Sequence, residues 1–215
     1  NPGIYIHIPY CKSKCGYCDF FSITDQSDKK DFLKYLLTEI KLYSTLFQTG
    51  HPFDTIYIGG GTPSLLSIEN LKSIIECLYQ SFSFTNNVET TLEVNPGTVD
   101  LEKLQYFKTI GINRLSIGIQ SFNNNDLQRL ERIHTAAEAV NCFNLSRESG
   151  FDNINIDLIY ALPEQNLQQW EENLIEAVQL SPEHISAYNL TFEKDTKFSL
   201  LRKTGHLHSH RESTE

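Results

Sequence analysis

Short apolar runs alternate along the chain with longer segments in which apolar residues recur every three to four positions. The runs predict strands and the longer segments predict amphipathic helices. Because a helical segment separates each strand from the next, the pattern favours a parallel sheet with right-handed crossovers, a barrel or an open part of one. Strands are expected at 4–8, 55–58, 89–94, 114–119, 153–159 and 184–190, and helices at 28–46, 67–81, 100–110, 124–130, 136–148 and 167–180.

Residues at the helix ends support this division. Asp28, Ser67 and Asp100 are suited to N-cap positions, and Gly111 and Gly150 fall where helices are expected to stop. No linker, low-complexity stretch or internal repeat divides the chain, so we expect residues 1–215 to form one domain.

The expected strands have two different faces. Ile154, Ile156 and Leu158 share one face of their strand, while Asn155 and Asp157 share the other. In a barrel the apolar face packs on helices and the polar face lines the lumen, which predicts a binding cavity. An antiparallel sheet with one solvated face is the alternative. The same alternation sets Glu93, Asn95, Ser116 and Gln120 against Leu92, Val94, Leu115, Ile117 and Ile119.

Composition narrows the function classes. The 215 residues carry 27 acidic and 18 basic side chains, a formal net charge of −9, which disfavours binding to the phosphates of nucleic acids. No apolar run approaches the roughly 18 residues needed to span a bilayer. Five cysteines without a recognisable export signal indicate a reducing compartment, and we expect the cytoplasm.

Three of these cysteines, Cys11, Cys15 and Cys18, lie within eight positions directly after the first strand. Three thiolates can hold three irons of a four-iron, four-sulfur cluster and leave the fourth iron open to another ligand. Zinc is the main alternative, but no Cys or His close in sequence completes a four-ligand site. A disulfide set would need an even number of cysteines in a secreted protein, and structural thiols remain a further alternative.

Other polar residues gather at the carboxyl ends of the expected strands. The glycine-rich turn at 59–64 would let a ligand approach the backbone, but it lacks the Lys of a phosphate-binding loop, so a small zwitterion fits better. Glu93, Gln120 and Asp157 come from three strands, near their carboxyl ends. These side chains can accept hydrogen bonds from an ammonium or from hydroxyls, and Arg132 could bind a carboxylate.

The Cys-x3-Cys-x2-Cys spacing, with an aromatic residue before the third Cys, resembles the signature of the radical S-adenosylmethionine (SAM) superfamily. Further segments extend the resemblance over the whole chain. They are similar to the oxygen-independent coproporphyrinogen III oxidase family and to its HemW-type haem-chaperone branch. These segments are 5–11, 59–64, 93–98, 113–122, 155–163 and 184–193.

The resemblance implies a parallel (β/α)6 partial TIM barrel, the radical SAM core. Cys11, Cys15 and Cys18 would hold a [4Fe-4S] cluster, and the amino and carboxylate groups of SAM would bind the open iron. Family enzymes cleave SAM reductively to a 5′-deoxyadenosyl radical that abstracts hydrogen from a substrate, which requires a reductant. The SAM-contacting positions would be Tyr5, Tyr17, Gly60, Gly61, Thr62, Glu93, Gln120, Arg132 and Asp157.

Two details bear on the branch. The oxidase branch carries a further Cys two residues after the third, where this chain has Phe20. With the Leu-Thr-Phe-Glu segment at 190–193, this resembles the haem-chaperone branch, which binds haem and transfers it to acceptor proteins. Oxidation of coproporphyrinogen III in porphyrin biosynthesis is the enzymatic alternative, and a structural iron–sulfur module is the third. Ala161 stands where the family usually has Gly, and we expect the family's C-terminal domain to lie outside these residues.

Overall fold

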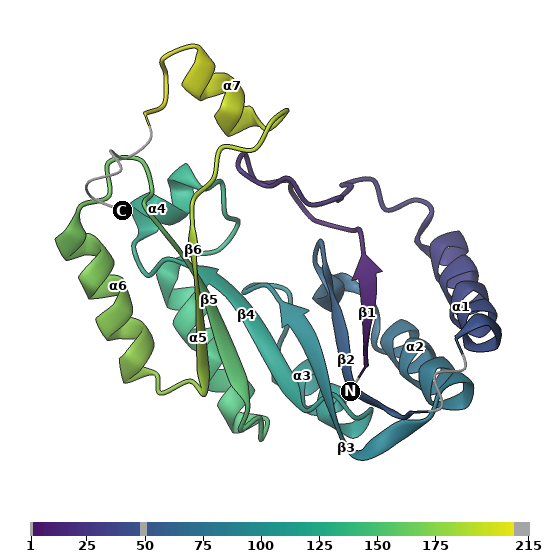
Figure 1. Cartoon of the computed structure of the whole chain (residues 1–215). Coiled ribbons are helices and arrows are strands. Elements are labelled where there is room, and N and C mark those ends of the chain that lie inside the picture. Colours follow the sequence, from purple (N-terminus) through teal and green to yellow (C-terminus); the bar gives the residue numbers. More distant parts are fainter. Residues whose placement is uncertain (1, 48–50, 209–215) are drawn as a thin grey trace.

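A computed structural model describes residues 2–47 and 51–208, in which six strands form one parallel sheet in the order β1-β2-β3-β4-β5-β6. The strands follow one another in space as they do in the sequence, and the sheet is curved (Figure 1). The parallel arrangement rules out the antiparallel alternative. The strands are β1 Gly3–Ile8, β2 Phe53–Gly60, β3 Phe84–Val94, β4 Arg114–Gln120, β5 Ile154–Tyr160 and β6 His184–Asn189.

Helices cover the convex side of the sheet and leave the concave side open (Figure 1). Neighbouring helices pack on each other, α1 on α2, α2 on α3 and α3 on α5. In the part of the chain that the structure describes, β1 and β6 do not pair, so the barrel is partial, as predicted. The helices are α1 Lys29–Leu46, α2 Ile68–Ser81, α3 Leu101–Thr109, α4 Asn124–Arg129, α5 Ala136–Glu148, α6 Leu167–Gln179 and α7 Lys197–Lys203, with a 3-10 turn η1 at Pro63–Leu65.

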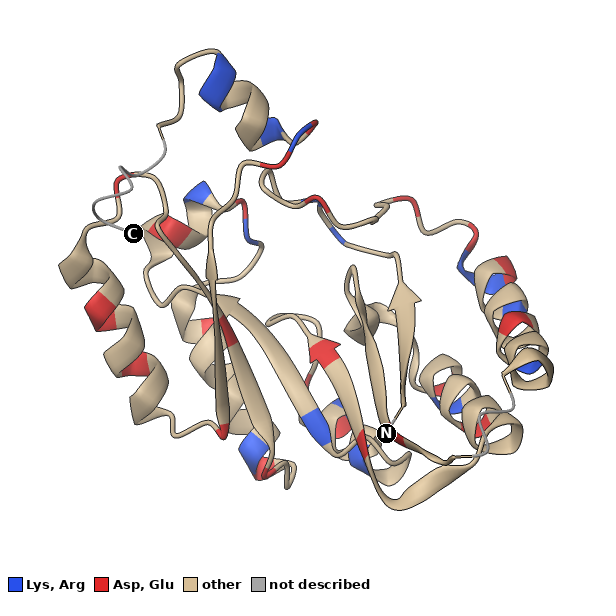
Figure 2. Cartoon of the chain, viewed as in Figure 1, with Lys and Arg blue, Asp and Glu red and all other residues tan. Residues whose placement is uncertain are grey.

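The two faces of the strands follow the predicted alternation. Ile154, Ile156 and Leu158 of β5 are fully buried in the core beneath the helices. Asp157 lies on the concave side, where its register partners are Gly118 of β4 and Ser186 of β6. Charged residues lie mostly on helices and loops, and the strands carry few (Figure 2).

The helix boundaries are confirmed. Ser67 and Asp100 cap α2 and α3 through their side chains, and Gly111 and Gly150 adopt positive φ just after helices. Asp28 occupies the predicted N-cap position of α1, but its side chain makes no capping hydrogen bond there. Its carboxylate instead accepts a hydrogen bond of 2.7 Å from the hydroxyl of the buried Tyr10.

One helix was not predicted. The segment after β6 forms α7, whose Phe198 is buried in a second, smaller apolar cluster with Leu130, Ile159, Leu162 and Leu190. Figure 1 places α7 at the same end of the sheet as the loop that follows β1. None of the helices within residues 2–47 and 51–208 is both long enough and apolar enough to cross a membrane.

Candidate functional site

The three clustered cysteines lie on the loop that leaves β1, at the carboxyl end of the sheet. The backbone at Cys11 is fixed by a hydrogen bond of 2.9 Å from its amide to the carbonyl of Ile23, whose own amide donates to Pro9 at 2.7 Å. The amide of Cys18 donates to the carbonyl of Cys15 at 3.1 Å, which closes a turn. All three thiols are half-buried and free, and burial raises the pKa of Cys18, so metal binding has to displace its proton.

A chain of hydrogen bonds connects two of these sulfurs across the top of the sheet. The Thr62 hydroxyl donates to Cys11 Sγ at 3.6 Å, and Asn95 Nδ2 donates to Thr62 Oγ1 at 2.9 Å. Arg132 Nη2 donates to Asn95 Oδ1 at 2.5 Å, and its Nη1 donates to Cys15 Sγ at 3.8 Å. Two residues predicted for the site, Thr62 and Arg132, are therefore joined through a third, Asn95, for which no role was predicted.

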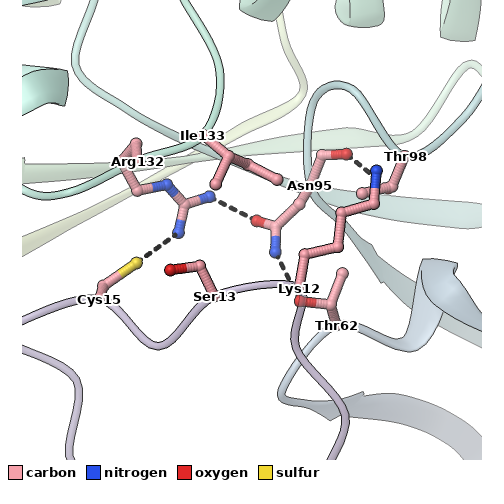
Figure 3. A pocket seen from close by; sticks show the side chains of 8 residues that line it. All are labelled: Lys12, Ser13, Cys15, Thr62, Asn95, Thr98, Arg132 and Ile133. Carbon is pink, nitrogen blue, oxygen red and sulfur yellow. Dashed lines mark hydrogen bonds between the residues drawn. The ribbon is translucent and has the colours of Figure 1, made fainter. Parts of the chain in front are cut away.

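The same residues line a small pocket between the cysteine loop and the ends of β2 and β3 (Figure 3). In Figure 3 the Arg132 guanidinium lies between Cys15 and Asn95. The Arg132 Nε atom is buried and has no hydrogen-bond partner among the described residues, so it can still donate to a ligand. The pocket is lined by Lys12, Ser13, Cys15, Thr62, Asn95, Thr98, Arg132 and Ile133.

The glycine-rich turn approaches the cysteine loop so closely that side chains would not fit. A Cβ on Gly61 would lie 2.8 Å from the carbonyl oxygen of Tyr10 and 3.0 Å from Cys11 Sγ. The Gly61 amide donates to the carbonyl of Ile8 at 2.7 Å, which ties the turn to β1. Gly60 has φ +115, a conformation that Gly adopts without strain.

On the concave side of the sheet, Glu93 is held from two directions. Tyr57 donates its hydroxyl proton to Glu93 Oε1 at 2.9 Å, and the Gly60 amide donates to Oε2 at 3.0 Å. Burial nevertheless raises the pKa of Glu93 to about 7, with a smaller contribution from the charge of Asp157. Each oxygen keeps a lone pair, so a cationic ligand can still bind.

Asp157 belongs to a polar network that crosses β4, β5 and β6. Its oxygens accept hydrogen bonds from Ser116 at 2.9 Å and from Asn155 at 2.8 Å, and Ser186 donates to Asn155 Oδ1 at 3.0 Å. Burial raises the pKa of Asp157 as well, against the lowering effect of these hydrogen bonds. The lumen therefore presents two largely buried carboxyl groups, from Glu93 on β3 and Asp157 on β5, with β4 between these strands.

The remaining predicted positions lie around this centre. Tyr5 stacks on Tyr57 with ring centroids 5.8 Å apart, beside the Glu93 site. Tyr17 faces the second apolar cluster, where its ring meets Phe198 edge-on at 6.1 Å. Gln120 ends β4 with φ 72, at a register shift between β4 and β5.

Sequence reasoning gave no role to Tyr57 and Asn95. Tyr57 lies in an apolar-looking strand, and only its register beside β3 puts its hydroxyl on Glu93. Asn95 lies on the polar face noted for its strand, directly after Val94, and that alternation was the available signal.

The cysteines do not converge on a single point. Within residues 2–47 and 51–208, no three Cys, His, Asp or Glu side chains come close enough together to hold one metal ion. In a four-iron cluster each of the three cysteines would bind a different iron.

Comparison with known proteins places these features in a family. The sequence model of the radical SAM superfamily matches residues 5–176. This chain belongs to the radical SAM superfamily.

Its relatives within the superfamily include haem chaperones and an oxidase. The chain is 44% identical to the haem chaperone HemW of Haemophilus influenzae, with 92% of this chain and 53% of that protein aligned. It is 33% identical to the oxygen-independent coproporphyrinogen III oxidase of Synechocystis, over 88% of this chain and 41% of that protein. The chain spans about half the length of the curated relatives it matches.

A solved structure agrees with the fold. Coproporphyrinogen III oxidase (HemN) from Escherichia coli, a radical SAM enzyme, superposes with a TM-score of 0.84 at 30% sequence identity and covers 99% of this chain and 49% of its own. The radical SAM fold, predicted as a partial barrel, is therefore confirmed.

Radical SAM proteins imply a [4Fe-4S] cluster and SAM, and the residues of this chain fit both. The cysteine loop offers three free thiols, and Gly61 leaves room beside Cys11. The unpartnered Arg132 Nε matches a carboxylate or another acceptor, and the buried Glu93 carboxyl matches an ammonium or a hydroxyl group. The donors and acceptors therefore suit a zwitterionic ligand lying beside a cluster.

Proposed function

We propose that this radical SAM chain is the core of a haem chaperone, which binds haem and transfers it to acceptor proteins. The observation that carries the proposal is the 44% identity to HemW over 92% of the chain. The loop after β1 adds to it, because Asp19 and Phe20 follow Cys18 and no fourth cysteine is present there. The partners are haem and proteins that accept it.

In this proposal Cys11, Cys15 and Cys18 would hold the cluster, and residues of the glycine turn and the lumen wall would hold SAM. A reduced cluster would supply the electron that cleaves SAM to a hydrogen-abstracting radical, whereas in a chaperone the bound SAM would serve as a structural or regulatory ligand. Tyr5, Tyr17, Gln120 and Asp157 complete the pocket around Gly60, Gly61, Thr62, Glu93 and Arg132. Gly60, Glu93 and Gln120 lie within the last two residues of β2, β3 and β4, and Tyr17, Gly61 and Thr62 lie in the loops that follow β1 and β2.

The chain's own groups have separable tasks. Glu93, held by Tyr57 and Gly60, accepts from the ligand's ammonium or hydroxyl groups once it is ionised. Arg132 donates to Cys15 and to Asn95, which leaves its Nε for the carboxylate of SAM. Gly61 supplies backbone at a distance that no side chain would allow.

The enzymatic alternative is the oxidation of coproporphyrinogen III. It is supported by the structural match to HemN and by the 33% identity to the Synechocystis oxidase. The chaperone is preferred because the identity to HemW is higher and extends over slightly more of the chain. A purely structural iron–sulfur module would leave the buried carboxyl groups of the lumen without a ligand.

Two assays on the anaerobically reconstituted protein separate these functions. For a chaperone, haem titration should produce a saturable shift of the Soret band, and the haem should move to apomyoglobin on mixing. Incubation with reductant, SAM and coproporphyrinogen III should leave the porphyrinogen unchanged. Formation of protoporphyrinogen would overturn the proposal in favour of the oxidase.

A further inference from the structure

Both ends of the Asn95 side-chain amide make hydrogen bonds. Its Oδ1 accepts from Arg132 Nη2 at 2.5 Å, and its Nδ2 donates to Thr62 Oγ1 at 2.9 Å. A guanidinium can only donate, so the oxygen has to face Arg132 and the nitrogen has to face Thr62. The order of these bonds is therefore fixed by chemistry.

Each partner of Asn95 in turn donates to a cysteine sulfur. Because Thr62 Oγ1 accepts a hydrogen bond from Asn95 Nδ2, its own hydroxyl proton is free to donate to Cys11 Sγ at 3.6 Å. Arg132 uses Nη2 for Asn95 and Nη1 for Cys15 Sγ at 3.8 Å. Bonds arranged in series polarise one another, so the central amide strengthens both donors.

The backbone of Asn95 is itself anchored at the end of β3. Its carbonyl accepts a hydrogen bond of 2.6 Å from Thr98 Oγ1, and its amide donates to Ser64 Oγ at 3.4 Å. The hydroxyls of Ser64 and Thr98 lie 2.7 Å apart. Asn95 thus links the end of β3 to the cysteine loop through Thr62 and Arg132.

We infer that Asn95 is a positioning residue for the iron–sulfur cluster, which aims the Thr62 and Arg132 donors at Cys11 and Cys15. The inference rests on the proposed cluster and goes beyond it, because Asn95 touches neither sulfur. Hydrogen bonds and positive charge near the sulfurs stabilise the reduced, more negative cluster and raise its reduction potential. Loss of the Asn95 amide lets both donors turn away, which makes the cluster harder to reduce.

The test compares Asn95→Leu with Asn113→Leu in the reconstituted protein. Asn113 also uses both ends of its amide, there to bridge the backbone of Thr90 at 2.8 Å and Val88 at 2.8 Å, and it lies just before β4, at the opposite end of the sheet from the cysteines. EPR-monitored redox titration gives the midpoint potential. At the wild-type midpoint, N95L should show about a tenfold lower ratio of reduced to oxidised cluster, about 59 mV for a one-electron couple.

N113L should keep the wild-type potential even though it also loses stability. An unchanged potential in N95L would overturn the inference and leave Asn95 a structural residue. If N95L does not retain a cluster, Thr62→Val and Thr62→Ser decide: T62V should lower the potential and T62S should restore it, and a wild-type potential in T62V would overturn the inference. A wild-type protein that binds no four-iron cluster would instead refute the proposed function.

Discussion

The two halves of the candidate site are held in place by interactions of different strength. On the lumen wall, Glu93 and Asp157 accept hydrogen bonds of 2.8 to 3.0 Å from residues of β2, β4 and β5. On the loop after β1, Cys11 and Cys15 receive contacts of only 3.6 and 3.8 Å. The carboxyl groups of the wall are therefore held firmly by the paired strands, whereas backbone hydrogen bonds hold the loop and its sulfurs receive only weak contacts.

The difference has a physical origin. Strand register fixes the wall, because all residues of β5, and all of β4 except Ile119, are paired with a neighbouring strand, and the bonds between polar side chains follow. The loop has no such ladder, and sulfur is a weak hydrogen-bond partner. Folding of the sheet and loading of the metal should thus be separable.

The largest expected effect comes from removing a ligand. Cys15→Ala should reduce the iron and sulfide content after reconstitution from about four each per chain to below one. The far-UV circular dichroism should stay unchanged, because Cys15 lies on a loop outside the strands. Iron and sulfide assays measure the loss of the cluster, and the circular dichroism spectrum shows whether the fold is kept.

The matched control is Cys142→Ala. Cys142 is only 3% exposed, on the buried face of α5, so its replacement costs packing but removes no proposed ligand. C142A should keep four irons with a lower melting temperature. A C15A protein with a full complement of iron would contradict the assignment of the cysteine loop.

The second effect is steric. Gly61→Ala puts a Cβ 2.8 Å from the carbonyl of Tyr10 and 3.0 Å from Cys11 Sγ, so the cysteine loop has to move. We expect the iron content to fall by at least half, while the sheet remains folded. Iron analysis of the reconstituted variant measures the loss.

Gly111→Ala is the matched control for Gly61→Ala. Gly111 has φ +94 and open space around its Cβ position, so the substitution strains the backbone by about 1 kcal/mol without touching the loop. G111A should melt earlier and keep its iron. Equal iron loss in both variants would mean that general instability, and not the close approach, governs loading.

The wall and the loop also differ in how far the sequence could predict them. Side chains along a strand alternate between its two faces. The polar residues Glu93 and Asp157 could therefore be assigned to the face that lines the lumen from the sequence alone. The cysteine set was recognisable by its spacing. The contact between Asn95 and Arg132 was not, because it joins residues 37 positions apart through a loop whose path no periodicity describes.

The sequence did not predict a backbone conformation that is unusual for the residue type. Ala161 has φ 57, a region that favours Gly, at the position where the resemblance leads one to expect Gly. The sequence showed Ala161 as a departure from the family pattern, but it did not show that this residue adopts a positive φ. The helix α7 spans only 7 residues, too short for a periodicity to stand out.

The third prediction concerns the charge of the wall. Because the pKa of Glu93 is raised to about 7, SAM should bind about tenfold more weakly for each pH unit below 7, where the carboxylate is lost. Above that pH the affinity should level off. Isothermal titration calorimetry between pH 6 and 8 measures the affinity for SAM. The Glu93→Gln variant should bind SAM weakly, with no such pH dependence.

Ionisation of Glu93 should have opposite effects on SAM binding and on the stability of the fold: it favours binding and lowers the stability. The unfolded chain ionises Glu93 near 4.5, and the folded chain ionises it only near 7. The stability that the neutral carboxyl contributes is present below pH 4.5 and is lost as the pH rises through 7. E93Q should lack this loss in urea unfolding, and a steeper decline in E93Q would refute the assignment.

The smallest effect should come from the contact between α7 and the cysteine loop. The Phe198 amide donates to the Gly16 carbonyl at 2.9 Å, and its ring lies against Gly16 and Tyr17. Phe198→Leu keeps an apolar side chain but loses the edge-on contact with Tyr17, at a cost of about 1 kcal/mol. We expect a few-fold faster loss of iron to a chelator, while the strands stay protected from hydrogen exchange. Leu200→Ala, on the exposed side of α7, should leave the rate unchanged. Equal rates in F198L and the wild type would show that the loop is held by its metal ligands alone, which would make the contrast with the wall sharper still.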